Sequence, residues 1–347
     1  MTAGTHSDLV KEADRLEAIV ISMNIPREKL AALRQSFPEI RFVTPAAEDD
    51  DSGAPFQIAY RESPSIVMAD ADALIGWEIS PAALAAAPRL RWIHAASAGI
   101  EHFDLAAIAA RGIVMTNSRG VHAPNIAEHV LAMMLALTRR LPRLGQAQTA
   151  REWRDTATHA EVGELMGQTV LIVGLGEIGR AVAERAAGFG MRVHAVRRSP
   201  AHNGPPAVER TYPVSALTEA LAAADHVVVT LPDTRDSRGL FDVAAFAAMK
   251  PGAKIYNVGR GTTIDTAALT AALQSGGLGG AGLDVTDPEP LPPDSPLWAM
   301  EQVLITAHTA GATPRYWDRL EPLLADNIRR WQTGEPLRNL VDLDAGY

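Results

Sequence analysis

Short apolar runs alternate with amphipathic stretches along the first part of the chain. The runs predict β-strands at residues 18–22, 40–44, 73–76 and 91–95. Apolar residues at helical spacing predict helices over residues 27–37 and 81–87. This alternation is typical of an α/β domain with a parallel sheet.

The second part of the chain repeats the same pattern at greater length. A long helix is predicted at about residues 124–141, followed by an irregular polar arm over residues 142–164. Further apolar runs then predict strands at residues 169–173, 191–196, 225–231, 253–258, 281–285 and 303–307. The glycines within residues 276–280 are expected to end a helix and form a turn, and a last helix is expected over residues 314–333.

These elements predict an α/β fold of two domains, each built on a parallel sheet. Residues 1–118 are expected to form a smaller, flavodoxin-like substrate-binding domain. Residues 119–308 are expected to form a doubly wound, Rossmann-type dinucleotide-binding domain. The remaining segment, residues 309–347, is expected to return to the first domain.

The sequence TVLIVGLGEIG at residues 169–179 carries the strongest functional signal. An apolar strand leads directly into Gly174-x-Gly176-x-x-Gly179, and a helical sequence follows. In a dinucleotide fold Gly174 makes the tight turn, Gly176 lets the backbone approach the phosphates, and Gly179 lets helix and strand pack closely. The helix N-terminus supplies N–H groups and positive potential. The alternative is a glycine-rich turn in an α/β domain that binds no nucleotide.

The end of the next strand bears on the choice of cofactor. Domains that prefer NAD carry an acidic residue there, about 20 residues past the glycines, which binds the ribose 2′-hydroxyl. This chain has Arg197, Arg198 and Ser199 instead. Two guanidinium groups and a hydroxyl favour the 2′-phosphate of NADP, with NAD as the second choice. The alternative is a pair of solvated arginines on a loop.

Composition and charge exclude several classes of function. The 347 residues are 47% hydrophobic and carry a formal net charge of −9, which argues against a nucleic-acid or anionic-membrane partner. The chain has no cysteine, so disulfides, thiol nucleophiles and cysteine-ligated metals are excluded, and no metal site is expected. The first residues lack a signal pattern and the longest apolar runs, such as residues 130–137, are too short to span a membrane. A cytoplasmic location is therefore expected.

Arg260, Glu289 and His308 follow predicted strands of the dinucleotide-binding part, where ligands of open α/β sheets bind. When a reduced nicotinamide delivers hydride to a carbonyl carbon, a histidine can supply a proton to the oxygen. A carboxylate on its other ring nitrogen would orient the imidazole and favour its charged form. An arginine can clamp a substrate carboxylate and polarise the carbonyl. Taken singly, each residue is as easily a surface or structural group.

The order and spacing of ten short motifs resemble the D-isomer-specific 2-hydroxyacid dehydrogenase family, including its glyoxylate/hydroxypyruvate reductases. The motifs lie at residues 98–104 (AGIEHFD), 111–117 (RGIVMTN), 127–129 (AEH), 174–179 (GLGEIG), 231–232 (LP), 249–252 (MKPG), 257–261 (NVGRG), 283–285 (LDV), 288–292 (PEPLP) and 308–311 (HTAG). The similarity covers about residues 91–312.

The resemblance implies a role for each matching residue. Arg260, Glu289 and His308 would form the catalytic triad, and Asp284 would contact the nicotinamide carboxamide. Backbone N–H groups around Ala98 and Gly99 would bind the substrate carboxylate, together with Arg260 and His308. The residues that would line the cofactor are Gly174, Leu175, Gly176, Glu177, Ile178, Gly179, Arg197, Arg198, Ser199, Leu231, Pro232, Val258, Gly259, Asp284 and Gly311.

Two positions depart from the family pattern. Many members have proline immediately before the catalytic histidine, where this chain has Ala307, and Arg197 replaces the acidic residue of NAD-preferring members. The first 90 residues match little beyond the pattern of strands and helices. Substrate choice depends on their loops, and the expected substrate is a small 2-keto acid such as glyoxylate or hydroxypyruvate.

Other functions on the same scaffold stay open. A related dehydrogenase of formate, phosphite or phosphoglycerate and a dinucleotide-sensing binding protein are the alternatives. A short-chain reductase is excluded, because none of the five tyrosines begins a Tyr-x-x-x-Lys pair. The apolar helix at residues 124–141, with the arm that carries Trp153, predicts a homodimer, as the family resemblance also implies.

Overall fold

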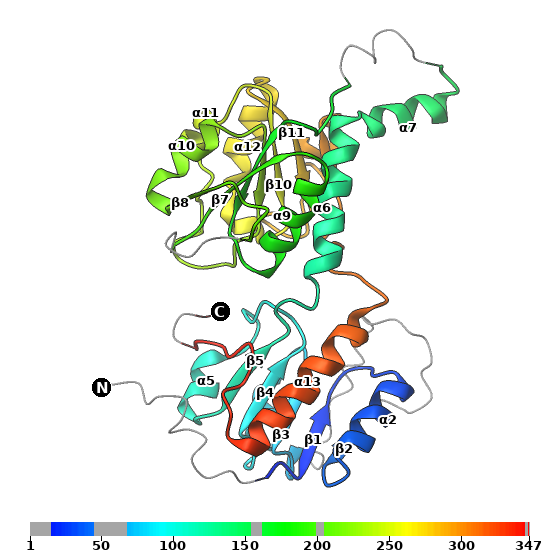
Figure 1. The fold of residues 1–347 in the computed structure, drawn as a ribbon, viewed down its shortest axis with the longest axis vertical. Helices are drawn as coiled ribbons and strands as arrows, with labels where there is room; N and C mark the ends of the chain where they lie inside the picture. Colours follow the sequence, from blue (N-terminus) through cyan, green and yellow to red (C-terminus); the bar gives the residue numbers. More distant parts are fainter. Residues whose placement is uncertain (1–14, 45–67, 154–161, 199–204, 344–345, 347) are drawn as a thin grey trace. The chain divides into compact units, whose positions relative to one another are not determined.

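The computed structural model describes residues 15–44, 68–153, 162–198, 205–343 and 346. The chain forms two compact units, one of residues 1–122 with 312–347 and one of residues 123–311 (Figure 1). No helix in these described ranges is both long and apolar enough to cross a bilayer.

The first unit is built on a five-stranded sheet in the order β2-β1-β3-β4-β5. Its strands are β1 (Ala18–Ile21), β2 (Arg41–Val43), β3 (Ala73–Gly76), β4 (Trp92–Ala95) and β5 (Val114–Asn117). All neighbouring pairs run parallel. Four of the five strands are buried along their whole length, which explains their continuous apolar sequences. The strand order is that of flavodoxin-like folds, as expected.

Helices cover this sheet. They are α2 (Arg27–Ser36), α4 (Pro81–Ala85), α5 (Leu105–Ala110) and α13 (Tyr316–Thr333). Side chains cap two of them, since Ser80 accepts a hydrogen bond from the Ala83 amide and Asp104 accepts one from the Ala107 amide. The buried face of α13 joins the core beside β1, so the C-terminal helix belongs to the first unit.

The second unit is built on a seven-stranded sheet in the order β12-β11-β10-β9-β6-β7-β8. Its strands are β6 (Thr169–Val173), β7 (Arg192–Val196), β8 (Arg210–Tyr212), β9 (His226–Val229), β10 (Ala253–Asn257), β11 (Leu278–Leu283) and β12 (Val303–Ile305). Every pair is parallel. The order reverses between β6 and β9, the switch point at which doubly wound sheets bind dinucleotides. The predicted α/β fold with one Rossmann-type sheet is confirmed.

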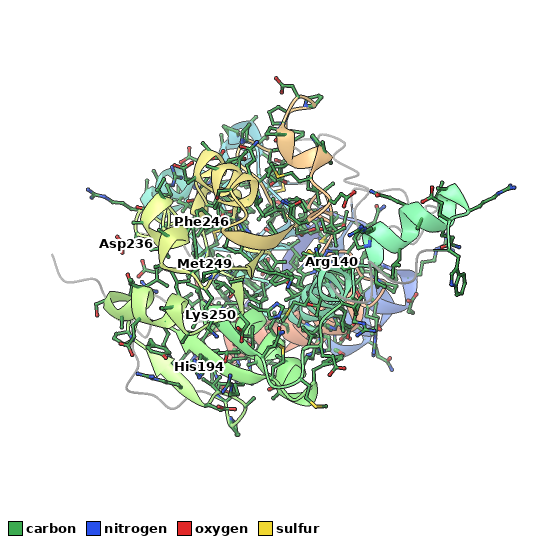
Figure 2. The ribbon with its side chains drawn as sticks, turned by 90° about the horizontal axis from the view of Figure 1, so that it is seen from above. Arg140, His194, Asp236, Phe246, Met249 and Lys250 are labelled. Carbon is green, nitrogen blue, oxygen red and sulfur yellow. The ribbon has the colours of Figure 1, made fainter. Side chains whose placement is uncertain are left out.

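Helices lie on both faces of this sheet (Figure 1). Their bounds are α6 (Ala123–Thr138), α7 (Leu141–Ala150), α9 (Glu177–Gly188), α10 (Leu217–Ala222), α11 (Val243–Ala248) and α12 (Thr266–Gln274), with 3-10 turns η1 (Val214–Ala216), η2 (Gly261–Thr263) and η3 (Pro296–Ala299). Helices α6 and α9 pack on one face, and α10 to α12 pack on the other. Figure 2 shows Phe246 of α11 and Met249, which follows this helix. Both side chains are buried in the core between the sheet and helices α10 to α12.

Two expectations about the elements were wrong. Residues 141–150 form helix α7 rather than part of an irregular arm, because Pro142 starts a helix well despite the polar residues that follow. Strand β11 begins at Leu278, inside the glycines expected to form a turn. A Cβ on Gly279 would lie 2.3 Å from the carbonyl oxygen of Gly252, so glycine there serves close backbone packing within the sheet.

Candidate active site

The three expected catalytic residues follow three adjacent strands. Arg260 comes after β10, Glu289 after β11 and His308 after β12. The strands are parallel, so their carboxyl ends form one edge of the sheet and all three residues belong to that edge. Gly174 and the loop after β9 stand at the same edge.

His308 and Glu289 form a direct pair. His308 Nδ1 lies 2.5 Å from Glu289 Oε1, and the two side chains are 53% and 40% exposed. A carboxylate only accepts hydrogen bonds, so Nδ1–H is the donor and the tautomer of the ring is fixed by this contact. Nε2 is then the ring nitrogen through which His308 can exchange a proton with a ligand.

The backbone around His308 is unusual. Ala307 and His308 have φ values of 45° and 56°, in the left-handed region that non-glycine residues seldom occupy. The His308 amide donates to the Asp284 carbonyl oxygen at 2.7 Å. Proline, with φ fixed near −65°, could not adopt the conformation of Ala307, so the departure from the family pattern matches this turn.

Asn257 holds the loop that carries Arg260. Its side-chain amide donates to the Arg260 carbonyl oxygen at 2.9 Å, and its Oδ1 accepts from the Gly259 amide at 3.0 Å. The Arg260 guanidinium donates to the Gly259 carbonyl oxygen at 2.9 Å. Gly261 follows without a side chain because a Cβ there would lie 1.9 Å from the Thr286 carbonyl oxygen.

The glycine motif has the geometry of a phosphate cradle. Gly174 has a φ of 106°, and a Cβ on Gly179 would lie 2.2 Å from the Gly174 carbonyl oxygen. Around Gly176 a Cβ would meet nothing within 4 Å, so the backbone there faces open space. Helix α9 begins at the next residue without a side-chain cap, so its first N–H groups can donate to a bound anion. These features fit a pyrophosphate.

The segments that follow the neighbouring strands β9 and β10 lie close to this cradle. Leu231 approaches Gly174, because its Cδ2 would lie 3.0 Å from a Cβ there. Gly259 approaches the Leu231 backbone more closely, since a Cβ on Gly259 would lie 2.6 Å from the Leu231 carbonyl oxygen. Of the other expected cofactor residues, Leu175 and Val258 are buried, and Ile178 and Gly311 are half-buried. Pro232 is exposed, as is Glu177 in the first turn of α9.

Arg197 and Arg198 come directly after β7, with Arg197 half-buried and Arg198 exposed. The Arg197 amide donates to the Tyr212 carbonyl oxygen of β8 at 3.1 Å, which ties the start of this loop to the sheet. Ser199, the third residue expected at the 2′-phosphate, lies outside the described residues.

Asp284, expected at the nicotinamide, is 4% exposed and organises the turn beyond β12. Its Oδ1 accepts from the Thr306 hydroxyl at 2.7 Å and from the Thr309 amide at 2.9 Å. The Ala310 amide lies 3.1 Å from both carboxylate oxygens. Sequence reasoning missed Thr306 and its neighbour His129 on α6, although His129 stands in the AEH motif.

Ala98 and Gly99 lie in the first unit, in the loop after β4. The Asn117 side-chain amide donates to the Ala98 carbonyl oxygen at 2.9 Å, and the Ser97 hydroxyl donates to the Gly99 carbonyl oxygen at 2.5 Å. Both carbonyl groups are therefore held in place, which fixes the orientation of the peptide groups around them.

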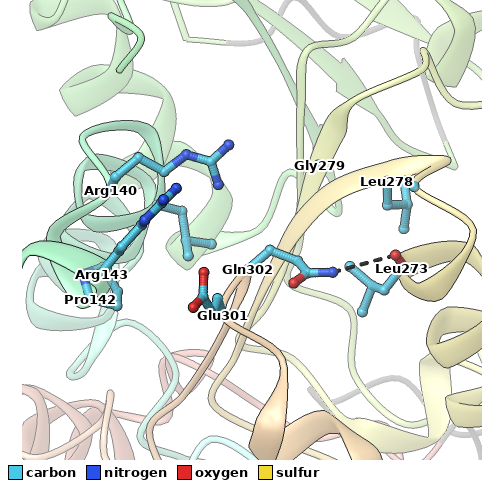
Figure 3. A pocket seen from close by; sticks show the side chains of 10 residues that line it. Arg140, Pro142, Arg143, Leu273, Leu278, Gly279, Glu301 and Gln302 are labelled. Atoms are coloured by element: carbon cyan, nitrogen blue, oxygen red, sulfur yellow. Dashed lines mark hydrogen bonds between the residues drawn. The ribbon is translucent and has the colours of Figure 1, made fainter. Parts of the chain in front are cut away.

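A cavity of about 230 Å³ lies away from these residues (Figure 3). It is found at the start of β11 and β12, the edge of the sheet opposite the glycine motif. Arg140 and Arg143 line one side, and Glu301 and Gln302 line another, with Gln302 donating to the Leu273 carbonyl oxygen at 3.4 Å. None of the predicted site residues lines this cavity. Within the described ranges no group of three or more His, Asp or Glu side chains is arranged to hold a metal ion.

The fold and this edge define a two-unit α/β protein with a dinucleotide cradle beside a histidine–carboxylate pair. The family model described as "D-isomer specific 2-hydroxyacid dehydrogenase, NAD binding domain" matches residues 131–310. The chain belongs to the D-isomer specific 2-hydroxyacid dehydrogenase family, so the resemblance noted in the sequence is confirmed.

Curated relatives are similar over most of the chain. D-3-phosphoglycerate dehydrogenase of Mycobacterium leprae is 35% identical over 280 residues, which is 80% of this chain but 52% of that protein. The chain thus spans about half the length of the phosphoglycerate dehydrogenases it matches. Glyoxylate/hydroxypyruvate reductase B of Citrobacter koseri is 35% identical over 278 residues, covering 79% of this chain and 85% of that protein.

Solved structures are similar to this chain over nearly its whole length. A D-isomer specific 2-hydroxyacid dehydrogenase from Xanthobacter autotrophicus in complex with NADPH has a TM-score of 0.76 and 31% identity, covering 96% of this chain and 100% of the other. The NADPH-dependent glyoxylate/hydroxypyruvate reductase of Sinorhizobium meliloti, in complex with NADP, has a TM-score of 0.76 and 27% identity over 95% of this chain and 100% of the other.

Proposed function

We propose that this chain is an oxidoreductase that transfers hydride between NADP(H) and a small 2-keto acid or D-2-hydroxy acid, with glyoxylate and hydroxypyruvate as the leading substrates. The observation that carries the proposal is the 2.5 Å contact between His308 Nδ1 and Glu289 Oε1 at the sheet edge that also bears the glycine cradle. The names of the Citrobacter koseri and Sinorhizobium meliloti proteins support the choice of substrate.

The side chains at this edge fit the chemistry of carbonyl reduction. A bound reduced nicotinamide supplies the hydride. The charged imidazole of His308 then donates its Nε2 proton to the carbonyl oxygen, while Glu289 keeps Nδ1 oriented and stabilises the positive charge. Arg260 clamps the substrate carboxylate. In the oxidative direction His308 accepts the proton.

The cofactor is proposed to be NADPH in preference to NADH. Arg197 and Arg198 directly follow β7, whose carboxyl end faces the ribose in this fold, and they supply positive charge where a carboxylate would repel a phosphate. The solved relatives that hold NADPH or NADP support this preference. Asp284 is proposed to contact the nicotinamide carboxamide through Oδ2. Among the described hydrogen bonds, this oxygen accepts only from the Ala310 amide, which also lies 3.1 Å from Oδ1.

The test is a panel of substrates with the purified chain. Glyoxylate, hydroxypyruvate and pyruvate are mixed with NADPH or NADH, and the loss of cofactor absorbance is followed. Formate, phosphite and 3-phosphoglycerate are assayed with the oxidised cofactors. We expect turnover with a 2-keto acid and NADPH. Binding of NADPH without turnover of any compound would contradict the proposal and favour a dinucleotide-sensing protein, and turnover in the second set alone would favour a related dehydrogenase.

A further inference from the structure

Helix α6 contacts the turn that carries His308 through two residues on one face. The Asn125 side-chain amide donates to the Ala310 carbonyl oxygen at 2.8 Å. Four residues further on, His129 Nε2 lies 2.9 Å from the Thr306 hydroxyl oxygen. Residues at this spacing lie above one another on a helix, so α6 presents both groups to residues 306–310.

The direction of each hydrogen bond follows from chemistry. Thr306 has one hydroxyl hydrogen, and the Asp284 carboxylate 2.7 Å away only accepts. The hydroxyl hydrogen is therefore donated to Asp284 Oδ1, and the hydroxyl oxygen accepts a hydrogen from His129 Nε2. This order fixes the tautomer of His129, with its proton on Nε2.

Asp284 in turn forms hydrogen bonds to the backbone of the turn. Its carboxylate accepts the Thr309 and Ala310 amides, and its carbonyl oxygen accepts the His308 amide at 2.7 Å. The Thr309 hydroxyl closes the turn by donating to the Thr306 carbonyl oxygen at 2.6 Å. A left-handed conformation at His308 costs free energy and persists only where surrounding contacts hold the backbone. These hydrogen bonds are such contacts.

We propose that His129 and Thr306 are positioning residues for the reaction, acting on His308 through Asp284. A series of hydrogen bonds runs from His129 to Thr306, from Thr306 to Asp284, and from Asp284 to the amides of residues 309 and 310. This series holds the His308 imidazole against Glu289. Neither residue is proposed to touch the substrate. This inference rests on the proposed function for its kinetic consequence, but its structural part can be tested without turnover.

Two matched pairs of variants separate the hydrogen bonds from bulk. Thr306→Val removes the hydroxyl and keeps the shape, whereas Thr306→Ser keeps the hydroxyl. His129→Leu removes the donor, whereas His129→Gln places an amide donor near the position of Nε2. We expect Thr306→Val and His129→Leu to lower kcat by roughly tenfold to a hundredfold, the effect of a small misplacement of a reacting group. The Ser and Gln variants should recover most of kcat, with little change in the NADPH dissociation constant throughout.

Hydrogen exchange gives a readout that needs no substrate. In Thr306→Val the amides of Thr309 and Ala310 should exchange faster, while those of α9 in the same unit keep their protection. Unchanged exchange at residues 309 and 310, a general loss of protection, or a Thr306→Ser variant as impaired as Thr306→Val would overturn the inference. So would faster exchange with normal kcat. If the wild type turns over none of the substrates, the proposed function fails and the exchange experiment still decides this inference.

Discussion

At the scale of single residues, Arg197 and Arg198 bear the clearest prediction about the cofactor. Replacing both by glutamine should raise the KM for NADPH well above any change in the KM for NADH, because only NADPH offers a phosphate to the lost charges. Each charged hydrogen bond contributes about 1.5–3 kcal/mol before solvent screening, so a tenfold difference or more is expected. Arg192→Gln, at the exposed opposite end of β7, is the control. Equal changes in both constants, or a wild type that prefers NADH, would contradict the assignment.

The single residues of the site differ in how far the sequence reveals them. The position of Arg260, Glu289 and His308 at one edge of the sheet could be predicted, because each follows an apolar strand and parallel strands bring such positions together. The contacts of His129 could not be predicted. Its partner Thr306 is 177 residues away in the sequence, and the pairing depends on how α6 packs on the sheet. The left-handed backbone at Ala307 and His308 left one sign in the sequence, the absence of the family's proline at position 307.

At the scale of elements, strand β9 carries a buried histidine that predicts a pH dependence of stability. Burial lowers the pKa of His226 to about 3, and the ring contacts Gln168 and Tyr256. Burial likewise lowers the pKa of His94 on β4 to about 3. In the unfolded state the histidines have a pKa near 6.5, so they bind protons at pH values where the buried rings stay neutral. The free energy of unfolding therefore falls as the pH drops from about 6.5 toward 3.

Urea unfolding followed by circular dichroism between pH 7 and pH 4 tests this dependence. His226→Gln should be less stable than the wild type at pH 7 but lose less stability on acidification, because it lacks one buried histidine with a lowered pKa. The carboxylates whose pKa is lowered below 3.8, such as Asp225, Asp318 and Asp326, act mainly below this range. The same pH slope in variant and wild type would show that His226 stays accessible to protons.

The elements that sequence reasoning missed are short or unusual in composition. Strand β8 has three residues and pairs only at the edge of the sheet, so it carries little periodic signal. The glycines of β11 imitate a turn, although they are required by backbone contacts to Gly252 and Gln302. Strands with long β-branched runs, such as β6 and β9, were predicted because burial on both faces leaves no polar positions.

At the scale of the whole molecule, we expect a homodimer through α6 and α7. Helix α7 extends away from the sheet of its own unit (Figure 1), Leu141 at its start is 51% exposed, and Trp153 just beyond it is 95% exposed. Apolar side chains of this size are costly in water, and a second copy of the chain would bury them. Light scattering at micromolar concentration should give twice the mass of one chain.

Substitutions can then locate that interface. Leu141→Arg combined with Trp153→Ala should shift the protein toward the monomer, whereas Val243→Arg, at a position 70% exposed on α11, should leave the dimer intact. A monomeric wild type would contradict the dimer itself. Dissociation by Val243→Arg but not by the α7 changes would place the interface elsewhere.

The central claim is that His308, held by Glu289, is the proton donor of a carbonyl reduction. The most direct measurement compares kcat with the NADPH dissociation constant in His308→Gln. We predict that kcat falls by about 10²–10⁴-fold while NADPH binding stays nearly unchanged, because the substitution removes acid–base catalysis and leaves the glycine cradle intact. Near-normal kcat in His308→Gln would show that another group or water supplies the proton, and would contradict the account.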